Sequence, residues 1–187
     1  MDTVFALRGE GFVLVVSDTG LAQSITQLAP DQRKTFELDD ALLLALAGEQ
    51  ADRCLLGPMI ERTARLLRMR HGRPLSTAEA AQLLRTRVAE RLRQGALQVG
   101  GIVAGGDGRL FWADALGAVV EVPHGAHGYA SYFVTSVLGD GWRAGMDEVE
   151  ALALARRCVA ELQTRLLLHQ PHFRFEVVDA KGIRRVE

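Results

Sequence analysis

Hydrophobic and polar positions divide the chain into blocks of strands and blocks of helices. Short apolar segments at 3–7 and 12–17, separated by a glycine-containing turn, predict a β-hairpin at the start of the chain. Residues 13–16 are apolar without alternation, which is typical of a strand covered on both faces. Segments 34–38 and 41–47 predict a second hairpin.

Two amphipathic helices are expected next, at 49–71 and from Ser76 to about residue 94. Apolar residues recur there at steps of three and four, and Ser76 with Glu79 three positions later forms the pattern of a capping box. The residues expected to face the core are Leu55, Met59, Ile60, Thr63, Leu66 and Leu67 in the first helix and Ala80, Leu83, Leu84, Val88 and Leu92 in the second.

The second half of the chain repeats this order of strands followed by helices. The expected strands are 98–104, 110–114 and 118–122, the expected helices 129–138 and 146–169, and the expected terminal hairpin 173–177 with 183–186. The apolar positions of the long helix include Val149, Leu152, Leu154, Ala155, Val159, Leu162 and Leu166. Helices and antiparallel strands in separate blocks predict an α+β fold.

Composition indicates one soluble domain spanning residues 1–187. The chain is 48% hydrophobic and 24% charged with a formal net charge of −1, and it contains no low-complexity linker. Cys54 and Cys158 are too few for a disulfide framework, so we expect small core residues in a reducing compartment. The first residues lack the pattern of a signal peptide, and no apolar run is long enough to cross a bilayer. We therefore expect a protein of the cytoplasm and nucleus.

Charge and spacing argue against several kinds of site. A balanced charge, and a basic stretch at 62–73 without aromatic residues, make nucleic acid and membranes unexpected partners. His124 and His127 are predicted to flank a turn without nearby Cys, Asp or Glu ligands, so we expect hydrogen-bonded or exposed histidines and no metal. The glycines at 105–108 lie between strands and do not match a phosphate-binding loop.

Five segments together resemble the beta subunits of the 20S proteasome, most of all the subunit at the fourth beta position. They are GFVLVVSD at 11–18, AGEQAD at 47–52, MRHGRPLS at 69–76, AHGY at 126–129 and VDAKGIR at 178–184. The resemblance covers the whole chain. It implies an N-terminal nucleophile hydrolase fold, a four-layer αββα sandwich of two antiparallel sheets between helical layers.

Active members of that family use an N-terminal threonine as nucleophile and its α-amino group as base. The resemblance puts Asp2 at this position, and a carboxylate cannot form the acyl intermediate. Thr3 is the nearest substitute, but it lies one residue further along the strand, where side chains point to the opposite face. We therefore expect no propeptide to be released ahead of Thr3.

The supporting residues of the family's site are half present. Asp18, Lys34 and Ser131 fall at or near positions that the family uses, whereas Leu166 and His169 stand where active subunits carry an aspartate and a serine. Asp18 and Lys34 are expected to form a partly buried ion pair rather than a catalytic pair. We interpret Asp2, Asp18, Lys34 and Ser131 as vestigial positions, with no catalytic residue, cofactor or metal.

The resemblance implies a non-catalytic structural subunit in the inner ring of the core particle. Its partners would be the other alpha and beta subunits, with the third and fifth beta subunits as ring neighbours and regulatory particles reached only through the assembled core. Active neighbours would carry out ATP- and ubiquitin-dependent protein degradation. Of 22 basic residues only Lys34 and Lys181 are lysines, a skew that permanent interfaces and codon bias explain equally well.

Two alternatives remain at this stage. A threonine peptidase using Thr3 after processing would have a mature chain that begins at Thr3 and would react with threonine-directed inhibitors. A free-standing binding module of the same fold would sediment as a stable monomer rather than purify with other subunits.

Overall fold

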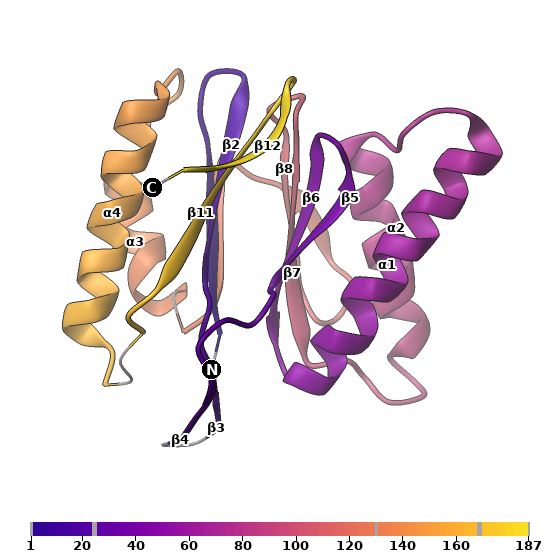
Figure 1. Cartoon of the computed structure of the whole chain (residues 1–187), viewed down its shortest axis with the longest axis horizontal. Helices are drawn as coiled ribbons and strands as arrows, with labels where there is room; N and C mark the ends of the chain where they lie inside the picture. The colour runs from indigo at the N-terminus through magenta and orange to yellow at the C-terminus, as the bar shows by residue number, and fades with distance from the viewer. Residues whose placement is uncertain (1, 24–25, 130, 168–169, 187) are drawn as a thin grey trace.

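The computed structural model describes residues 2–23, 26–129, 131–167 and 170–186. Two antiparallel sheets face each other in the middle of the molecule, and a pair of helices covers the outer face of each sheet (Figure 1). The layers follow the order helix, sheet, sheet, helix. This confirms both the α+β class predicted from the blocks and the four-layer sandwich implied by the resemblance.

The first sheet collects strands from both ends of the chain. Its order is β10 (His124–Gly128), β1 (Thr3–Arg8), β2 (Phe12–Asp18), β11 (Phe173–Asp179) and β12 (Gly182–Val186). The central strand β2 pairs with β1 on one side and β11 on the other. All of its residues are buried, which confirms the prediction from its unalternating apolar run.

The second sheet follows the chain in order from β5 to β9. Its strands are β5 (Thr35–Asp39), β6 (Leu42–Gly48), β7 (Val99–Gly105), β8 (Leu110–Ala113) and β9 (Val119–Glu121). A separate two-stranded hairpin of β3 (Leu21–Gln23) and β4 (Thr26–Ala29) projects from the lower end of the molecule in Figure 1. The sequence pattern did not predict this hairpin.

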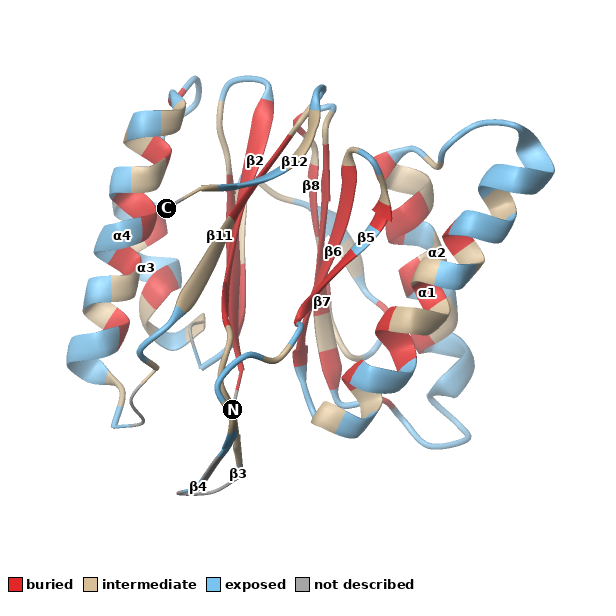
Figure 2. Cartoon of the chain, viewed as in Figure 1, coloured by how far each residue is buried: buried red, intermediate tan, exposed pale blue. Residues whose placement is uncertain are grey.

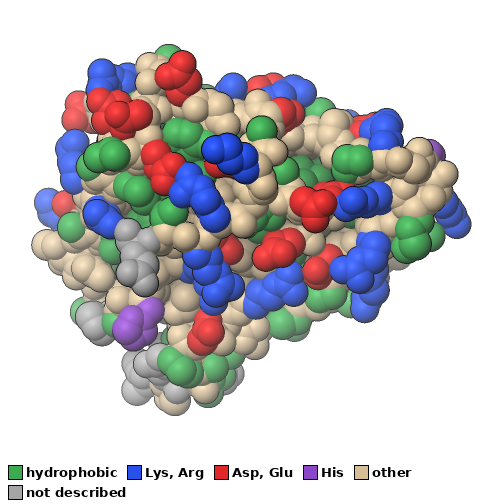
Figure 3. All heavy atoms as spheres, turned by 45° about the horizontal axis from the view of Figure 1, so that its top comes forward, with side chains coloured by type: hydrophobic (Ala, Val, Ile, Leu, Met, Phe, Trp, Pro, Cys, Tyr) green, Lys and Arg blue, Asp and Glu red, His purple; other side chains and the backbone are tan. Residues whose placement is uncertain are grey.

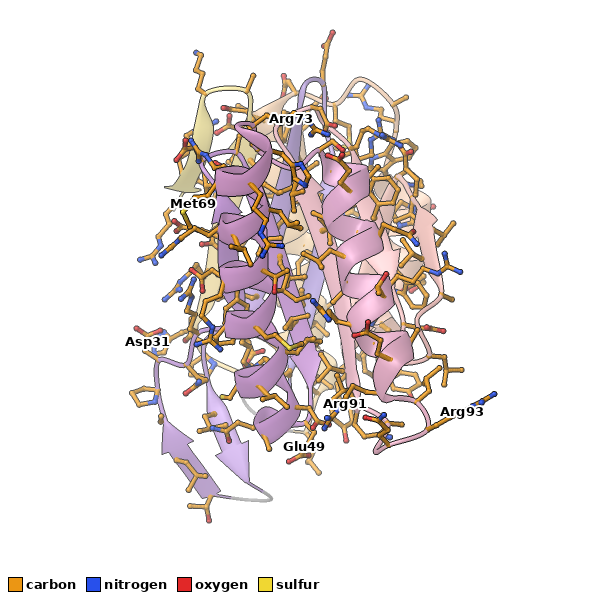
Figure 4. The ribbon with its side chains drawn as sticks, turned by 90° about the vertical axis from the view of Figure 1, so that its right-hand side faces the viewer. Asp31, Glu49, Met69, Arg73, Arg91 and Arg93 are labelled. Carbon is orange, nitrogen blue, oxygen red and sulfur yellow. The ribbon has the colours of Figure 1, made fainter. Side chains whose placement is uncertain are left out.

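The helices form the two outer layers. The second sheet is covered by α1 (Gln50–His71) and α2 (Thr77–Arg91), which lie side by side in Figure 4, whereas α3 (Ser131–Gly141) and α4 (Glu148–Arg165) cover the first sheet. The capping box at Ser76 and Glu79 is confirmed. The described part of α4 ends at Arg165, four residues before the predicted end, and the last two predicted residues, 168 and 169, lie outside the described residues.

Three apolar clusters separate the four layers. One fills the space between α1, α2 and the second sheet, another fills the space between α3, α4 and the first sheet, and the third lies between the sheets. Figure 2 shows the buried residues along the strands and on the inward faces of the helices. Because β1 and β2 contribute alternate residues to two clusters, both faces of the first sheet are closed to water.

The predicted inward face of α1 was partly wrong. Leu55 is 50% exposed and Leu66 is also exposed, while the buried face is rotated to include Arg53 and Leu56. Cys54 is exposed, so the expectation of a core cysteine holds only for Cys158. The other buried residues of α1, Gly57, Ile60 and Ala64, lie on the same helical face as Arg53 and Leu56. This face packs toward the second sheet.

Two further helix positions also differ from the prediction. Val149 is exposed in the first turn of α4, ahead of the buried face that begins at Ala151. Leu92 is partly exposed because α2 ends at Arg91 rather than near residue 94. Within the described residues, no helix is long and apolar enough to cross a membrane.

Candidate functional site

The candidate site lies at the start of β1, where neighbouring residues face opposite sides of the first sheet. Val4 belongs to the cluster between the sheets, and Phe5 belongs to the cluster against α3 and α4. By the same alternation Asp2 faces the second sheet and Thr3 faces the helical layer. The two candidate nucleophile positions therefore have different surroundings.

Both carboxylate oxygens of Asp2 are occupied. Oδ1 lies 2.9 Å from Lys34 Nζ. Oδ2 accepts a hydrogen bond from the Arg53 guanidinium and one from the Gly48 backbone N–H, at 3.2 Å. Since only 5% of Asp2 is exposed, its carboxylate is enclosed by these partners rather than presented to a substrate.

Lys34, the residue before β5, joins Asp2 to Asp18. Its ammonium lies 2.5 Å from Asp18 Oδ2, 2.9 Å from the Gly20 carbonyl oxygen and 2.9 Å from Asp2 Oδ1. The ammonium donates hydrogen bonds to Asp18 and Gly20, and its contact with Asp2 is an ion pair. Burial lowers the pKa of Lys34, and the charge and hydrogen bond of Asp18 oppose this shift. While its ammonium is paired with these oxygens, Lys34 has no free lone pair with which to accept a proton.

We call Asp2, Asp18, Lys34 and Arg53 the buried charge cluster. Each of the four is at most 5% exposed. Two negative and two positive charges balance, which offsets part of the cost of removing them from water. Burial is the largest influence on the pKa of three of them: it raises the pKa of Asp18, against the opposing effect of Lys34, and lowers the pKa of Lys34 and of Arg53.

Thr3 is fully buried and already hydrogen-bonded. Its backbone N–H donates to Asp18 Oδ1 at 2.7 Å, and its hydroxyl donates to Gln170 Oε1 at 2.8 Å. The hydroxyl thus points away from Lys34, on the other side of the strand. No base among the described residues is in hydrogen-bonding contact with it, since Gln170 offers an amide oxygen.

The other residues suggested by the resemblance do not join the cluster. The Ser131 hydroxyl donates to the Gly128 carbonyl oxygen at 2.8 Å. Leu166, at the end of α4, packs against the cluster between the first sheet and the helices. His169 lies outside the described residues. The structure therefore brings together three of the four positions that we interpreted as vestigial, Asp2, Asp18 and Lys34.

A glycine allows the chain near Ser131 to approach the start of β1. Gly128 has a φ of 74°, in the left-handed region, and a Cβ at this position would lie 1.9 Å from the Asp2 carbonyl oxygen. That same oxygen accepts the Tyr129 N–H at 3.2 Å. The contact fixes the beginning of β1 against β10.

Arg53 and Gln170 are the site residues that sequence reasoning missed. Arg53 falls on the same helical face as Leu56 and Ile60, and a lone arginine on a buried face requires an acidic partner. That spacing was the available signal for Arg53. Gln170 follows the end of α4 and carried no comparable signal.

The predicted turn around His124 and His127 was wrong, because both residues lie in β10. His127 is buried, stacks on Trp112 with ring centroids 4.8 Å apart, and makes a 3.1 Å hydrogen bond through Nε2 to the Gly101 carbonyl oxygen. His124 lies against Trp142. The described residues contain no group of three or more His, Cys, Asp or Glu arranged to hold a metal ion.

His127 predicts a pH dependence of folding. Burial lowers its pKa from 6.5 to about 4, so between these values the unfolded chain binds a proton that the folded chain does not. The free energy of unfolding should fall as pH drops from 6.5 to 4, by about 3 kcal/mol from this group. Denaturant titrations of His127→Gln should lack this contribution, and the same substitution at exposed His71 should retain it. Equal slopes for both variants would contradict this prediction.

The four layers and the polar residues collected at the head of β1 define an N-terminal nucleophile hydrolase fold. A comparison with protein families matches residues 1–178 to the proteasome subunit family. The chain belongs to this family, as a beta subunit of the proteasome core particle.

Similar proteins span nearly the same length. The chain is 35% identical to proteasome subunit beta type-2-B of Arabidopsis thaliana, over 98% of this chain and 94% of that protein. It is 30% identical to proteasome subunit beta type-2 of Dictyostelium discoideum, over 98% and 96% of the two chains. It is also 30% identical to proteasome subunit beta type-4 of Saccharomyces cerevisiae, over 100% and 98%.

Proposed function

We propose that this chain is a non-catalytic, single-domain structural subunit of the beta ring. The observation that carries the proposal is the environment of Asp2: a carboxylate stands at the nucleophile position, and Lys34, Arg53 and the Gly48 N–H occupy both of its oxygens. A nucleophile needs a free lone pair and a base to accept its proton. Asp2 offers a buried, neutralised carboxylate, and Lys34 has no free lone pair while its ammonium donates to Asp18 and Gly20 and pairs with Asp2.

The buried charge cluster has a structural role in this proposal. Asp2 directly precedes β1, and Asp18 is the last residue of β2. Lys34 directly precedes β5, and Arg53 lies in α1. The cluster therefore connects both sheets and one helical layer. It would keep the inner end of the sandwich rigid, so that the subunit forms part of the chamber wall while other beta subunits cleave peptide bonds.

The proposed location in the particle is the fourth beta position, between the third and fifth beta subunits. The likeness to relatives named beta type-2 supports it, together with the resemblance of the whole chain to the subunit at that position. The particle would act in both cytoplasm and nucleus.

The alternative, a peptidase that uses Thr3 after processing, has less support. Thr3 is fully buried, and its hydroxyl donates to Gln170 instead of facing Lys34. Activity would require the hydroxyl to rotate or the strand to slip by one residue, which would move every side chain of β1 to the other face of the sheet.

Thr3→Val tests the proposal, because valine keeps the shape of threonine and removes only the hydroxyl. We expect core particles that carry Thr3→Val to cleave each class of peptide substrate at the parental rate, after correction for the amount of particle. Assembly should persist, since a single neutral hydrogen bond contributes about 1 kcal/mol. Selective loss of one peptidase activity in fully assembled particles would show that Thr3 is catalytic.

A further inference from the structure

A charged cleft opens between the two sheets, lined by none of the four residues of the buried charge cluster. Both sheets end here, because β12 is the edge strand of the first sheet and β5 is the edge strand of the second. Figure 3 shows basic and acidic side chains next to one another over this face of the molecule. The cleft has a volume of about 420 Å³ and is lined by Asp31, Arg33, Thr35, Glu37, Arg174, Glu176 and Arg185. We call it the inter-sheet cleft.

Glu176 forms the floor of the inter-sheet cleft. In β11, Val177 packs toward the helices and Val178 toward the other sheet, so Glu176 also faces the space between the sheets. It is only 3% exposed. The Thr35 hydroxyl is in hydrogen-bonding contact with its carboxyl group, but the second oxygen, Oε2, has no hydrogen-bond partner. A buried carboxyl oxygen without a partner is costly.

The basic side chains around Glu176 either pair with other groups or make no hydrogen bond to its carboxyl group. Arg174 pairs with Asp31 at 3.0 Å. Arg33 lies 3.3 Å from a carboxylate on α1, Glu61, and donates to the Thr35 carbonyl oxygen at 2.8 Å.

Arg185 is the remaining base of the cleft. It lies directly across the β11–β12 pair from Glu176, yet its side chain is exposed and no hydrogen bond joins it to the Glu176 carboxyl group. Arg174 and Arg185 still act on Glu176 at a distance and lower its pKa, but burial has a larger effect and raises it. The arginines of the cleft thus leave the carboxyl group incompletely compensated.

A second acid faces Glu176 from the opposite sheet. Glu37 on β5 is exposed at the mouth of the cleft, and its charge adds to the rise in the pKa of Glu176. Within the described residues, neither glutamate has an ion-pair partner. Two facing carboxylates favour a cation between them. Two carboxylates are fewer ligands than a protein metal site normally supplies, so an organic cation fits better than a bare metal ion.

We propose that the inter-sheet cleft receives one basic side chain, a lysine or an arginine, from a neighbouring subunit of the core particle, held between Glu176 and Glu37. The chain belongs to a family whose members assemble with one another, which supplies a neighbour at close range. A cationic nitrogen would complete the hydrogen bonding of Glu176 and relieve its repulsion from Glu37. The proposal depends on assembly and not on the lack of catalysis.

The assembled particle provides the direct test. A cryo-electron microscopy map of core particles containing this chain should show a lysine or arginine nitrogen of a neighbouring subunit within about 3.2 Å of a carboxylate oxygen of Glu176 or Glu37. A cleft that faces solvent, or one in which Arg185 of the same chain rotates onto Glu176, would overturn the proposal. Either result would leave the proposed non-catalytic function unaffected.

A variant of Glu176 tests whether this contact helps to hold the chain in the particle. Glu176→Gln keeps the size of the side chain and removes its charge, and we expect it to release this chain from the particle in high salt at least about 10-fold faster than the parent. Glu10→Gln, at the exposed β1–β2 turn, is the matched control and should release at the parental rate. If Glu176→Gln fails to fold, exposed Glu37→Gln replaces it with the same expected direction. Release at the parental rate from a folded variant would overturn the proposal.

Discussion

Lys34→Met should lower the free energy of unfolding by about 3–5 kcal/mol, one of the two largest effects that we expect from a single change. The Lys34 ammonium is the common partner of Asp2 and Asp18, at 2.9 and 2.5 Å. Methionine fills a similar volume but leaves two buried carboxylates facing each other. One of them would have to take up a proton or draw water into the core. Chemical denaturation of the full chain near pH 7 measures the change.

Lys181→Met is the matched control, because Lys181 is the only other lysine of the chain and is exposed in the β11–β12 turn. Its unfolding free energy should stay within about 0.5 kcal/mol of the parent. A similarly small effect for Lys34→Met would mean that the buried charge cluster contributes little to stability.

The second large effect concerns the pair of Asp2 and Arg53. Arg53→Met removes a guanidinium hydrogen bond to Asp2 and should cost about 3 kcal/mol, since a buried carboxylate loses one of its two cationic partners. Asp2→Asn should cost a similar amount because it leaves the Arg53 charge uncompensated. The double variant should be more stable than the sum of both losses predicts, by about 2 kcal/mol. This coupling energy is measured by denaturation of all four proteins.

The exposed pair of Arg87 and Glu90 serves as a control for this cycle. These residues also form an ion pair, at 2.9 Å, but at the surface of α2. Their coupling energy should be about 0.3–0.5 kcal/mol and should fall in high salt. Equal coupling energies for the buried and the exposed pair would contradict the structural role proposed for the cluster.

The strands and helices with strong patterns could be predicted from the sequence. The unalternating apolar run of β2 indicated a strand covered on both faces. Turn residues between apolar segments predicted the hairpins β1–β2, β5–β6 and β11–β12. These signals are local. Local signals could not predict the four-layer arrangement, because it requires β11 from the end of the chain to pair with β2. That prediction came from the family resemblance.

Elements with weak patterns were missed for identifiable reasons. The strand β10 has the sequence HGAHG, in which glycines and histidines give no apolar alternation, and it is held by pairing with β1. The hairpin of β3 and β4 lies outside the sandwich, so burial imposes no pattern on it. Pairing with β1 therefore determined the conformation of β10. Among its described residues, the β3–β4 hairpin has no buried face that could produce a sequence signal.

The candidate site was predictable in its acids and its lysine but not in its arginine. Asp2, Asp18 and Lys34 were selected by their positions in the resemblance, and the structure brings them into contact. Arg53 was overlooked because the apolar stripe of α1 was placed around Leu55 instead of Leu56. A rotation of one residue on a helix moves a side chain by about 100°, which is enough to exchange a surface position for a buried one.

The most direct test of the non-catalytic role is the intact mass of this chain after assembled core particles react with a threonine-directed covalent inhibitor. Active beta subunits in the same particles provide the internal positive control and should each gain the mass of one inhibitor. We expect this chain to keep its unreacted mass, without cleavage directly before Thr3. A chain that begins at Thr3 and carries one inhibitor would contradict the proposal.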